Sequence, residues 1–236
     1  IQSNIVGFTN LLECCRKNNV SSLVYASSSS VYGGNKNLPY SEKQGVNHPV
    51  SLYAATKKSN ELIAHSYSHL YKIPSIGLRY FTVYGPWGRP DMAPMIFAKS
   101  ILENKKISIY NYGKMQRDFT YIDDIVEGTF RCCFKPAQAS TKFDYLSPDP
   151  SLSFAPHMVF NIGNSKPIEL MYFIELLEKF IGKKAIKDFQ PLQPGDVLCT
   201  AADTKSLENW IEFTPNTSIE SGVDKFIKWF KNHNKY

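Results

Sequence analysis

Apolar residues in the first part of the chain follow two patterns, one typical of helices and one typical of buried strands. In residues 1–19 apolar residues recur three or four positions apart, which is the period of a helix with one buried face, and residues 51–71 are helix-forming sequence. Short apolar runs lie between these stretches, and runs of this length are typical of buried strands. The expected elements are a helix over 1–19, a strand over 23–26, a polar loop over 35–49, a helix over 51–71 and a strand over 73–80.

The rest of the chain is less regular. Residues 82–94 are rich in Gly, Pro and aromatic side chains, and 135–156 carry four prolines, so both stretches are expected to be loops. Asp123 and Asp124 suit a helix N-terminus, and Gly182 suits a helix end. The expected elements are helices over 95–102, 122–134, 168–181, 204–210 and 218–231, strands over 107–110, 117–121 and 158–162, and an irregular segment over 190–203.

Strands that alternate with helices favour an α/β fold with a parallel sheet in the first part. The part from about residue 82 onward has the character of a smaller α/β lobe that binds substrate. The strand at 23–26 runs directly into four serines, Ser27 to Ser30. Open parallel sheets present ligand-binding groups at the carboxyl ends of their strands, so this serine run is a candidate binding position.

Composition excludes several classes of protein. The 236 residues are 43% hydrophobic, and the net charge of +6 comes from scattered lysines, so no nucleic-acid surface is expected. No apolar run approaches 18 residues and no signal peptide is visible, which indicates a cytoplasmic protein without a membrane span. The five cysteines form two adjacent pairs and a single residue, so we expect buried, reduced thiols rather than a metal site or disulfides.

The candidate chemistry lies in the helix expected at 51–71. Tyr53 and Lys57 are four residues apart, hence one turn apart on one helix face. An ammonium beside a tyrosine favours the phenolate and lowers a pKa that is ordinarily about 10, which suits an acid/base that acts on an alcohol. The same spacing occurs in Tyr32/Lys36 and Tyr110/Lys114, but those pairs are interrupted by turn-forming residues. His65 and His69 lack a third ligand and are expected to be surface histidines, not a metal site.

Six motifs in order carry a resemblance to a known family. They are YASSSSVYG, SLYAATK, LRYFTVYGPWGRPDMA, QRDFTYIDDIVEG, FNIGN and QPGDV. Together they resemble the extended short-chain dehydrogenases/reductases and, within these, the nucleotide-sugar 4-epimerases that act on UDP-glucuronate. This resemblance implies NAD as cofactor and a partial Rossmann-like, doubly wound parallel sheet at 1–81. It also implies that 82–236 mainly form the nucleotide-sugar-binding lobe, with some segments returning to the first sheet.

The resemblance also implies catalytic roles. Tyr53 would be the acid/base, and Lys57 would lower the pKa of that tyrosine and bind the nicotinamide ribose. Ser28 would share the proton with the substrate hydroxyl, although Ser29 and Ser30 remain alternatives because the sequence does not show which hydroxyl turns toward Tyr53.

The remaining roles concern the ligands. Asn4, Ser27 and Tyr80 would lie at the cofactor, together with Tyr53 and Lys57. Arg89 would face the sugar carboxylate, because a planar guanidinium can bind a carboxylate through two parallel hydrogen bonds; the alternative for Arg89 is a loop ion pair with Asp91. The other substrate-binding candidates are Ser29, Ser30, Thr82, Arg117 for the pyrophosphate and Asp196 for the uridine ribose.

One family feature is absent from residues 1–236. The Gly-x-x-Gly-x-x-Gly loop that approaches the pyrophosphate of NAD is not found, nor is the acidic residue for the adenosine ribose. We therefore expect an N-terminally truncated chain that is inactive and poorly stable alone, an expectation that tight NAD binding measured by calorimetry would refute. The full-length enzyme is expected to be a homodimer through helices that include 51–71.

The sequence thus predicts NAD-dependent epimerisation at C4 of a UDP-sugar, from UDP-glucuronate to UDP-galacturonate, through a 4-keto intermediate. Two alternatives remain. One is another NAD-dependent reaction on the same machinery, by a different nucleotide-sugar epimerase, a dehydratase or a decarboxylase; the absence of a carboxylate at Ser29 and Ser30 disfavours the dehydratase. The other is an inactive fragment that retains the fold.

Overall fold

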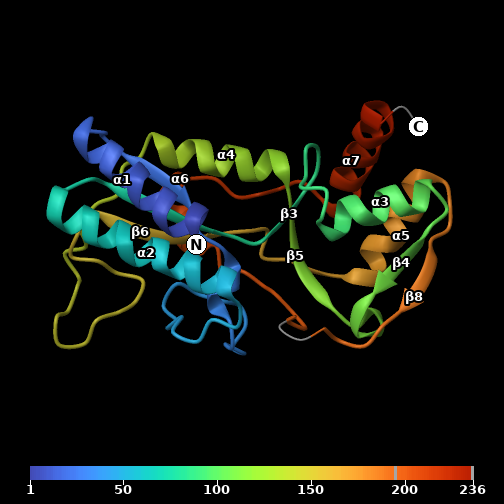
Figure 1. Ribbon diagram of the computed structural model, residues 1–236, viewed down its shortest axis with the longest axis horizontal. Coiled ribbons are helices and arrows are strands. Elements are labelled where there is room, and N and C mark those ends of the chain that lie inside the picture. Colours follow the sequence, from blue (N-terminus) through green and yellow to red (C-terminus); the bar gives the residue numbers. More distant parts are fainter. Residues whose placement is uncertain (194–195, 235–236) are drawn as a thin grey trace. The chain divides into compact units, whose positions relative to one another are not determined.

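The computed structural model describes residues 1–193 and 196–234. The chain divides into two compact units, each assembled from three separate segments. Unit 1 consists of Ile1–Phe81, Val126–Ile162 and Ala202–Thr214. Unit 2 consists of Thr82–Ile125, Gly163–Ala201 and Pro215–Tyr236. Each unit has its own β-strands and packed helices, several of which are labelled in Figure 1.

Unit 1 is built on a three-stranded parallel sheet. Its strands are β1 (Leu23–Ala26), β2 (Ser75–Tyr80) and β6 (His157–Ile162), in the spatial order β1-β2-β6. All pairs are parallel, so the carboxyl ends of the three strands lie at one edge. This arrangement confirms the predicted α/β fold with a parallel sheet. It also places the serine run that follows β1 at the ligand-binding edge typical of such sheets.

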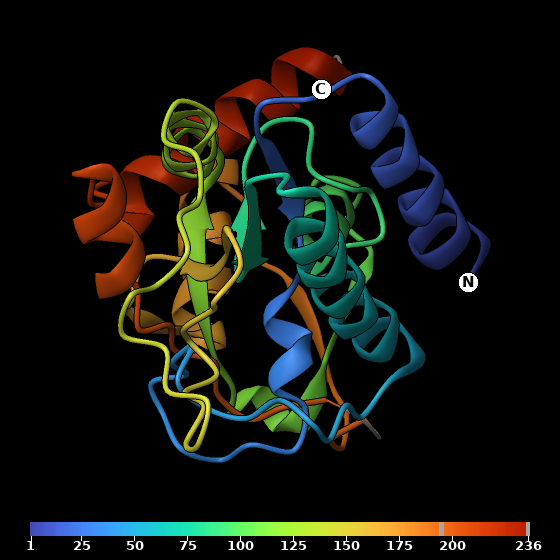
Figure 2. The same ribbon diagram turned by 90° about the vertical axis from the view of Figure 1, so that its left-hand side faces the viewer.

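Helices flank this sheet. Figure 2 shows α1 and α2 on one side of the unit 1 sheet and α6 on the other. The expected helix at 1–19 is present as one π-helical turn that continues into α1. The helical segments of unit 1 are the π-helix Gln2–Gly7, α1 (Phe8–Lys17), the 3₁₀-helix Ser29–Tyr32, α2 (Leu52–Tyr71), most of α4 (Ile122–Cys133) and α6 (Lys205–Ile211).

Local signals define the ends of α2. Ser51 is in an extended conformation and its side chain accepts a hydrogen bond from the backbone N–H of Ala54, which is a typical N-cap. At the other end, Lys72 takes the left-handed conformation with φ 56° and stops the helix. The buried face of α2 is small and polar rather than apolar, because it includes Asn60 and Glu61. That composition matters for the site described below.

Unit 2 has two smaller sheets and three long helices. The first sheet has the order β3-β5-β7, with β3 parallel and β7 antiparallel to β5, and the second is the parallel pair β4-β8. Phe173, Ile174, Leu177 and Phe226 are fully buried in its core. The elements are β3 (Thr82–Tyr84), α3 (Ala93–Leu102), β4 (Lys106–Ile109), the 3₁₀-helix Tyr110–Gly113, β5 (Gln116–Tyr121), β7 (Pro167–Glu169), α5 (Leu170–Ile181), β8 (Ile186–Phe189) and α7 (Ile219–Asn234).

Three expectations about elements were wrong. The first residues of the expected loop at 82–94 form β3, and β7 and β8 were not predicted at all. These strands are three or four residues long, too short for a two-residue period to stand out, and pairing with β5 or β4 creates them. Residues 194 and 195, within the expected irregular segment 190–203, lie outside the described residues.

The expectation of buried thiols was also wrong in part. All five cysteines are free, but Cys14 and Cys133 are exposed and Cys199 is half-buried, whereas Cys15 and Cys132 are buried. Among residues 1–193 and 196–234, no helix combines the length and apolar character needed to cross a membrane. Within the same residues, no group of three or more His, Cys, Asp or Glu side chains is arranged to hold a metal ion.

Candidate active site

The centre of the candidate site in unit 1 is the first two turns of α2. Tyr53 is 48% exposed, so part of this residue is accessible to a ligand. The Nζ atom of Lys57 lies 5.9 Å from the centre of the Tyr53 ring, as the helical spacing predicts. Nζ also donates a hydrogen bond of 3.1 Å to the carbonyl of Ala26, the last residue of β1. The lysine therefore links the helix to the carboxyl end of the strand.

The serine run forms a turn in which each hydroxyl has a different role. Ser27 is buried and donates to Oε1 of Glu61 at 2.7 Å, so its proton is engaged inside the protein. Ser28 is the N-cap of the following 3₁₀-helix, and its Oγ accepts from the N–H and the hydroxyl of Ser30, at 3.2 and 2.8 Å. Neither bond uses the Ser28 proton. Ser28 can therefore still donate to a substrate, whereas Ser27 and Ser30 already donate within the protein.

A cavity of about 500 Å³ lies beside Lys57. It is bounded by the N-terminal helical segment, the whole of β1, and Lys57 and Asn60 of α2. Asn4 belongs to its wall and donates to Oγ1 of Thr56 at 3.0 Å, while the Asn60 amide donates to the backbone carbonyl of Asn4. Burial lowers the pKa of Lys57, consistent with an ammonium held partly away from water.

This cavity bears on the cofactor that the resemblance implies. Lys57, Asn4 and Asn60 are the polar residues in this wall that could meet the hydroxyls of a ribose. Residues 1–236 contain no Gly-x-x-Gly-x-x-Gly sequence for the pyrophosphate. The residues present therefore include polar partners for a ribose and do not supply the usual pyrophosphate loop.

Tyr80 and Thr82 belong to different units of the chain. Tyr80 ends β2 in unit 1, and its hydroxyl is 3.0 Å from Oγ1 of Thr129. Burial raises the pKa of this tyrosine, so its hydroxyl stays protonated. Thr82 begins β3 in unit 2 and pairs with Phe119. Among the described residues, no hydrogen bond joins Tyr80 to Tyr53 or Lys57.

In unit 2 the two residues expected at the nucleotide contact each other. The guanidinium of Arg117 donates to Oδ1 of Asp196 at 2.8 Å, and to the backbone carbonyl of Leu198 at 3.3 Å. Both side chains are largely buried, with 16% and 31% exposed. Pro194 and Gly195 of the QPGDV motif lie outside the described residues. This pair holds the segment 196–198 against β5.

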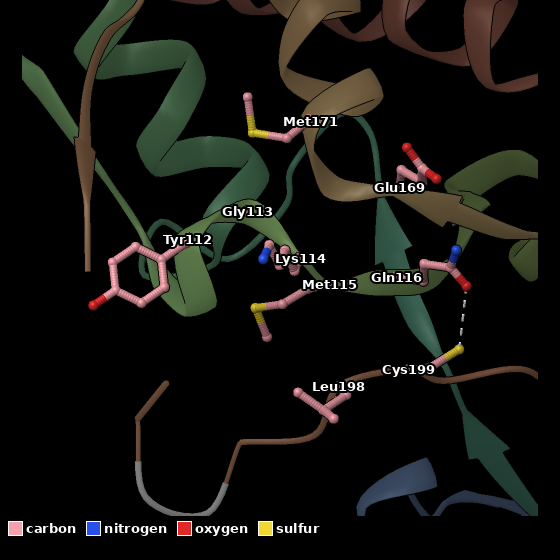
Figure 3. Close-up of a pocket in the computed structure, with 9 residues that line it drawn as sticks. All are labelled: Tyr112, Gly113, Lys114, Met115, Gln116, Glu169, Met171, Leu198 and Cys199. Carbon is pink, nitrogen blue, oxygen red and sulfur yellow. Dashed lines mark hydrogen bonds between the residues drawn. The ribbon is translucent and has the colours of Figure 1, made fainter. Parts of the chain in front are cut away.

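A cavity of about 540 Å³ in unit 2 is shown in Figure 3. Gln116 and Cys199, which are sequence neighbours of Arg117 and Leu198, contact each other at its wall, where Sγ donates to the amide oxygen at 3.6 Å. Sequence reasoning missed both residues; the position of Gln116 directly before Arg117 in the QRDFTY motif was the available signal. The other residues that line the cavity are Tyr112, Gly113, Lys114, Met115, Glu169, Met171 and Leu198.

Arg89 lies on the surface of unit 2. Its side chain is 68% exposed, and Nε donates to Oδ1 of Asp91 at 2.6 Å. A second nitrogen of the guanidinium is 3.4 Å from Sδ of Met92. The alternative noted from the sequence, a loop ion pair with Asp91, is therefore the geometry seen. Because such an exposed pair contributes little to stability, the guanidinium can exchange Asp91 for another carboxylate at small cost.

One of the two histidines of α2, His65, differs from the expectation of a surface residue. His69 is exposed, but His65 is half-buried between the rings of Phe154 and His157, with centroids 5.3 and 5.4 Å away. Burial lowers the pKa of His65, and burial together with the neighbouring His65 lowers that of His157 to about 3. His65 is therefore a packed residue, because the loop that carries Phe154 covers this part of α2.

Known proteins resemble this chain in sequence and in fold over nearly its whole length. The chain is 54% identical to protein CapI of Staphylococcus aureus over 235 residues, which are 100% of this chain and 70% of CapI. It is 45% identical to a probable UDP-glucuronate 4-epimerase of Rhizobium meliloti, covering 98% of this chain and 68% of that protein. A crystal structure of UDP-glucuronic acid 4-epimerase from Bacillus cereus, in complex with UDP-glucuronic acid and NAD, superposes with a TM-score of 0.84 at 34% identity, covering 99% of this chain and 68% of that one.

A family assignment follows from these matches and from the site. Residues 1–145, which hold the serine turn, Tyr53, Lys57 and Arg117, match the family as one continuous stretch. High identity over the whole chain and a shared fold with solved epimerases point the same way. The chain belongs to the NAD dependent epimerase/dehydratase family.

Proposed function

We propose that the protein epimerises a UDP-sugar at C4 and converts UDP-glucuronate into UDP-galacturonate. The observation that carries this proposal is the arrangement around the start of α2. Tyr53 is accessible, Lys57 lies one turn further on, and the adjoining serine turn leaves the Ser28 proton available. These three groups are what removal of a proton from a sugar hydroxyl requires. The likeness to UDP-glucuronate 4-epimerases supports the choice of sugar.

In the proposed reaction Tyr53, as phenolate, accepts the proton of the C4 hydroxyl while Ser28 hydrogen-bonds the same oxygen. Bound NAD would supply the acceptor for the hydride that leaves C4. Lys57 and Asn4 would hold the nicotinamide ribose, and the positive charge of Lys57 would favour the negative oxygen of Tyr53. The 4-keto sugar would then turn in the site and receive the hydride on its other face, and Tyr53 would return the proton to the C4 oxygen. No net oxidation occurs, so one bound cofactor serves every turnover.

The remaining residues are assigned to substrate binding. Arg89 would exchange Asp91 for the sugar carboxylate, and this grip also protects the 4-keto uronate, a β-keto acid that can lose CO₂. Arg117 would bind the diphosphate and Asp196 the uridine ribose. The roles of Ser27 and Tyr80 at the cofactor, and of Ser29, Ser30 and Thr82 at the substrate, stay predictions.

We also infer that the full-length protein is a homodimer. Several apolar side chains on α2 are exposed, among them Leu62 at 58% and Leu70 at 64%. A second copy of the same helix is a fitting partner, because a twofold axis pairs identical apolar faces. Sedimentation of the full-length protein tests this inference: a dimer supports it and a monomer at micromolar concentration would contradict it.

The proposed reaction is tested with the full-length protein and UDP-glucuronate, followed by proton NMR. UDP-galacturonate is the expected product. UDP-xylose would identify a decarboxylase, and conversion of UDP-glucose with no action on UDP-glucuronate would identify an epimerase of neutral sugars. A substrate that stays unchanged in the presence of NAD would leave only the alternative of a fold without turnover.

A further inference from the structure

A buried ion pair lies behind the candidate catalytic residues of unit 1. Glu61 of α2 and Arg79 of β2 are 2% and 3% exposed. Nε and one terminal nitrogen of Arg79 donate to the two oxygens of Glu61 at 2.8 and 3.0 Å, a two-point contact that fixes both planes. Lys58 adds a third donor at 3.2 Å. Burial of such a pair costs free energy, because two charges lose their hydration.

This pair joins the elements that carry the catalytic candidates. Glu61 lies one turn beyond Lys57 on the same helix, and its Oε1 also accepts the proton of Ser27 at 2.7 Å. Arg79 donates to the hydroxyl of Tyr32, at the end of the 3₁₀-helix that Ser28 caps, at 3.1 Å. Both ends of the serine turn are therefore attached to one carboxylate–guanidinium pair.

The attachment determines the orientation of the turn. Ser27 follows β1 directly, and its side chain is directed toward Glu61. Ser28 is extended, with φ −159° and ψ 146°, and adjacent side chains of an extended chain point to opposite sides. With Ser27 tied to Glu61, Ser28 turns its hydroxyl away from the buried pair. The same hydrogen bond thus removes Ser27 from the chemistry and sets the direction of Ser28.

Stability alone does not account for such a pair. Replacement of a buried ion pair by apolar residues of similar size is often neutral or stabilising, whereas removal of one partner is costly. Burial acts to raise the pKa of Glu61, yet the hydrogen bonds and charge of Arg79, with Lys58, hold it at about 2. The carboxylate is therefore ionised, and able to hold Ser27 and Arg79, throughout the neutral range.

We propose that Glu61 and Arg79 are positioning residues that hold the Ser27–Tyr32 turn in register with Tyr53 and Lys57. The proposal rests on the proposed epimerase function. It predicts that the pair is needed for turnover more than for stability or substrate binding.

The test compares three variants in the full-length protein. In the double variant Glu61→Leu/Arg79→Leu, an apolar pair replaces the ions, so the protein is expected to fold with a melting temperature near that of the wild type. Its kcat is expected to fall about 100-fold while KM for the UDP-sugar changes by less than about threefold. Ser27→Ala, which removes one hydrogen bond, is expected to lower kcat by about threefold to tenfold. Arg79→Lys keeps the charge without the two-point contact and is expected to lie between the wild type and the double variant.

Glu178 provides a matched control. It is a buried glutamate of α5 in unit 2, 3% exposed at its side chain, and it pairs with Lys184 and Lys187 at 2.8 and 2.5 Å. Glu178→Gln should lower the melting temperature and leave kcat unchanged, since this pair touches no catalytic candidate.

The outcomes separate the two proposals. A double variant or Ser27→Ala that keeps the wild-type kcat would overturn the positioning role, as would a loss of kcat in Glu178→Gln equal to that in the double variant at equal loss of stability. If the double variant does not fold, Ser27→Ala and Arg79→Lys decide the question by the same split between kcat and KM. A wild-type protein without epimerase activity on any UDP-sugar would overturn the proposed function and, with it, this inference.

Discussion

Lys57 and Ala26 join the catalytic helix to the end of the first strand, through a hydrogen bond of 3.1 Å from the ammonium to the carbonyl. The bond holds Nζ beside the Tyr53 ring, 5.9 Å from its centre, and Lys57 belongs to the wall of the neighbouring cavity. A lysine in that position can serve a cofactor hydroxyl and the tyrosine oxygen together. The predictions below follow from this geometry and from that of unit 2.

Tyr53→Phe removes the proposed proton acceptor and little else. The residue is half exposed, so the variant should keep the wild-type melting temperature. The kcat for epimerisation should fall by about 100-fold to 10,000-fold, the range typical of general acid–base groups. NMR assay of the full-length variant measures kcat, and circular dichroism provides the folding control. Unchanged kcat would remove Tyr53 from the mechanism.

Arg89→Met tests the binding of the uronate carboxylate. Loss of a charge-assisted pair should raise KM for UDP-glucuronate by about tenfold to 100-fold. Binding of UDP alone, which has no carboxylate, should not change, and the high exposure of Arg89 predicts an unchanged melting temperature. Asp91→Asn is the matched control and should lower KM slightly, because the guanidinium loses its competing partner. Equal weakening of UDP and UDP-glucuronate by Arg89→Met would contradict the assignment.

Arg117→Met tests the diphosphate role. Arg117 is held by Asp196 and Leu198, so the variant should lose a pre-oriented cation and raise the dissociation constant of UDP by about tenfold to 100-fold. Calorimetry with UDP and with uridine separates the contributions. Affinity for uridine should change far less, since uridine has no phosphate. If uridine binding falls as much as UDP binding, Arg117 only supports the fold of the 196–198 segment.

Part of the fold and of the candidate site could be predicted from the sequence, and the rest could not be predicted for physical reasons. The sequence predicted a helix over 51–71, which is α2 within one residue, and with it the placement of Tyr53 and Lys57 on one face. The Arg117–Asp196 and Glu61–Arg79 contacts were not predicted, because no local period indicates which carboxylate meets which guanidinium. Strands β3, β7 and β8 of unit 2 were missed for the same reason, since their partners are distant in the chain.

The buried acid and imidazole groups predict how stability depends on pH. Glu61 has a folded pKa of about 2 against an ordinary 4.5, and that of His157 is about 3 against 6.5. In both cases the unfolded chain binds more protons in acid, so the free energy of unfolding falls as the pH falls. The His157 contribution should be lost from about pH 6.5 to 3 and that of Glu61 from about pH 4.5 to 2.

Urea unfolding at a series of pH values measures this slope. His157→Gln removes the titrating ring, so its stability should change less with pH in the upper part of the window. A slope that His157→Gln leaves unaltered between about pH 6.5 and 4.5 would show that the ring is protonated equally in both states.

The most direct measurement of the central claim uses UDP-glucuronate labelled with deuterium at C4, together with the full-length protein. If hydride leaves C4, stays on the enzyme and returns to the other face, the UDP-galacturonate formed must still carry deuterium at C4, even in ordinary water. The proposed function predicts full retention of the label. Hydrogen from water at C4 of the product, or no UDP-galacturonate at all, would contradict it.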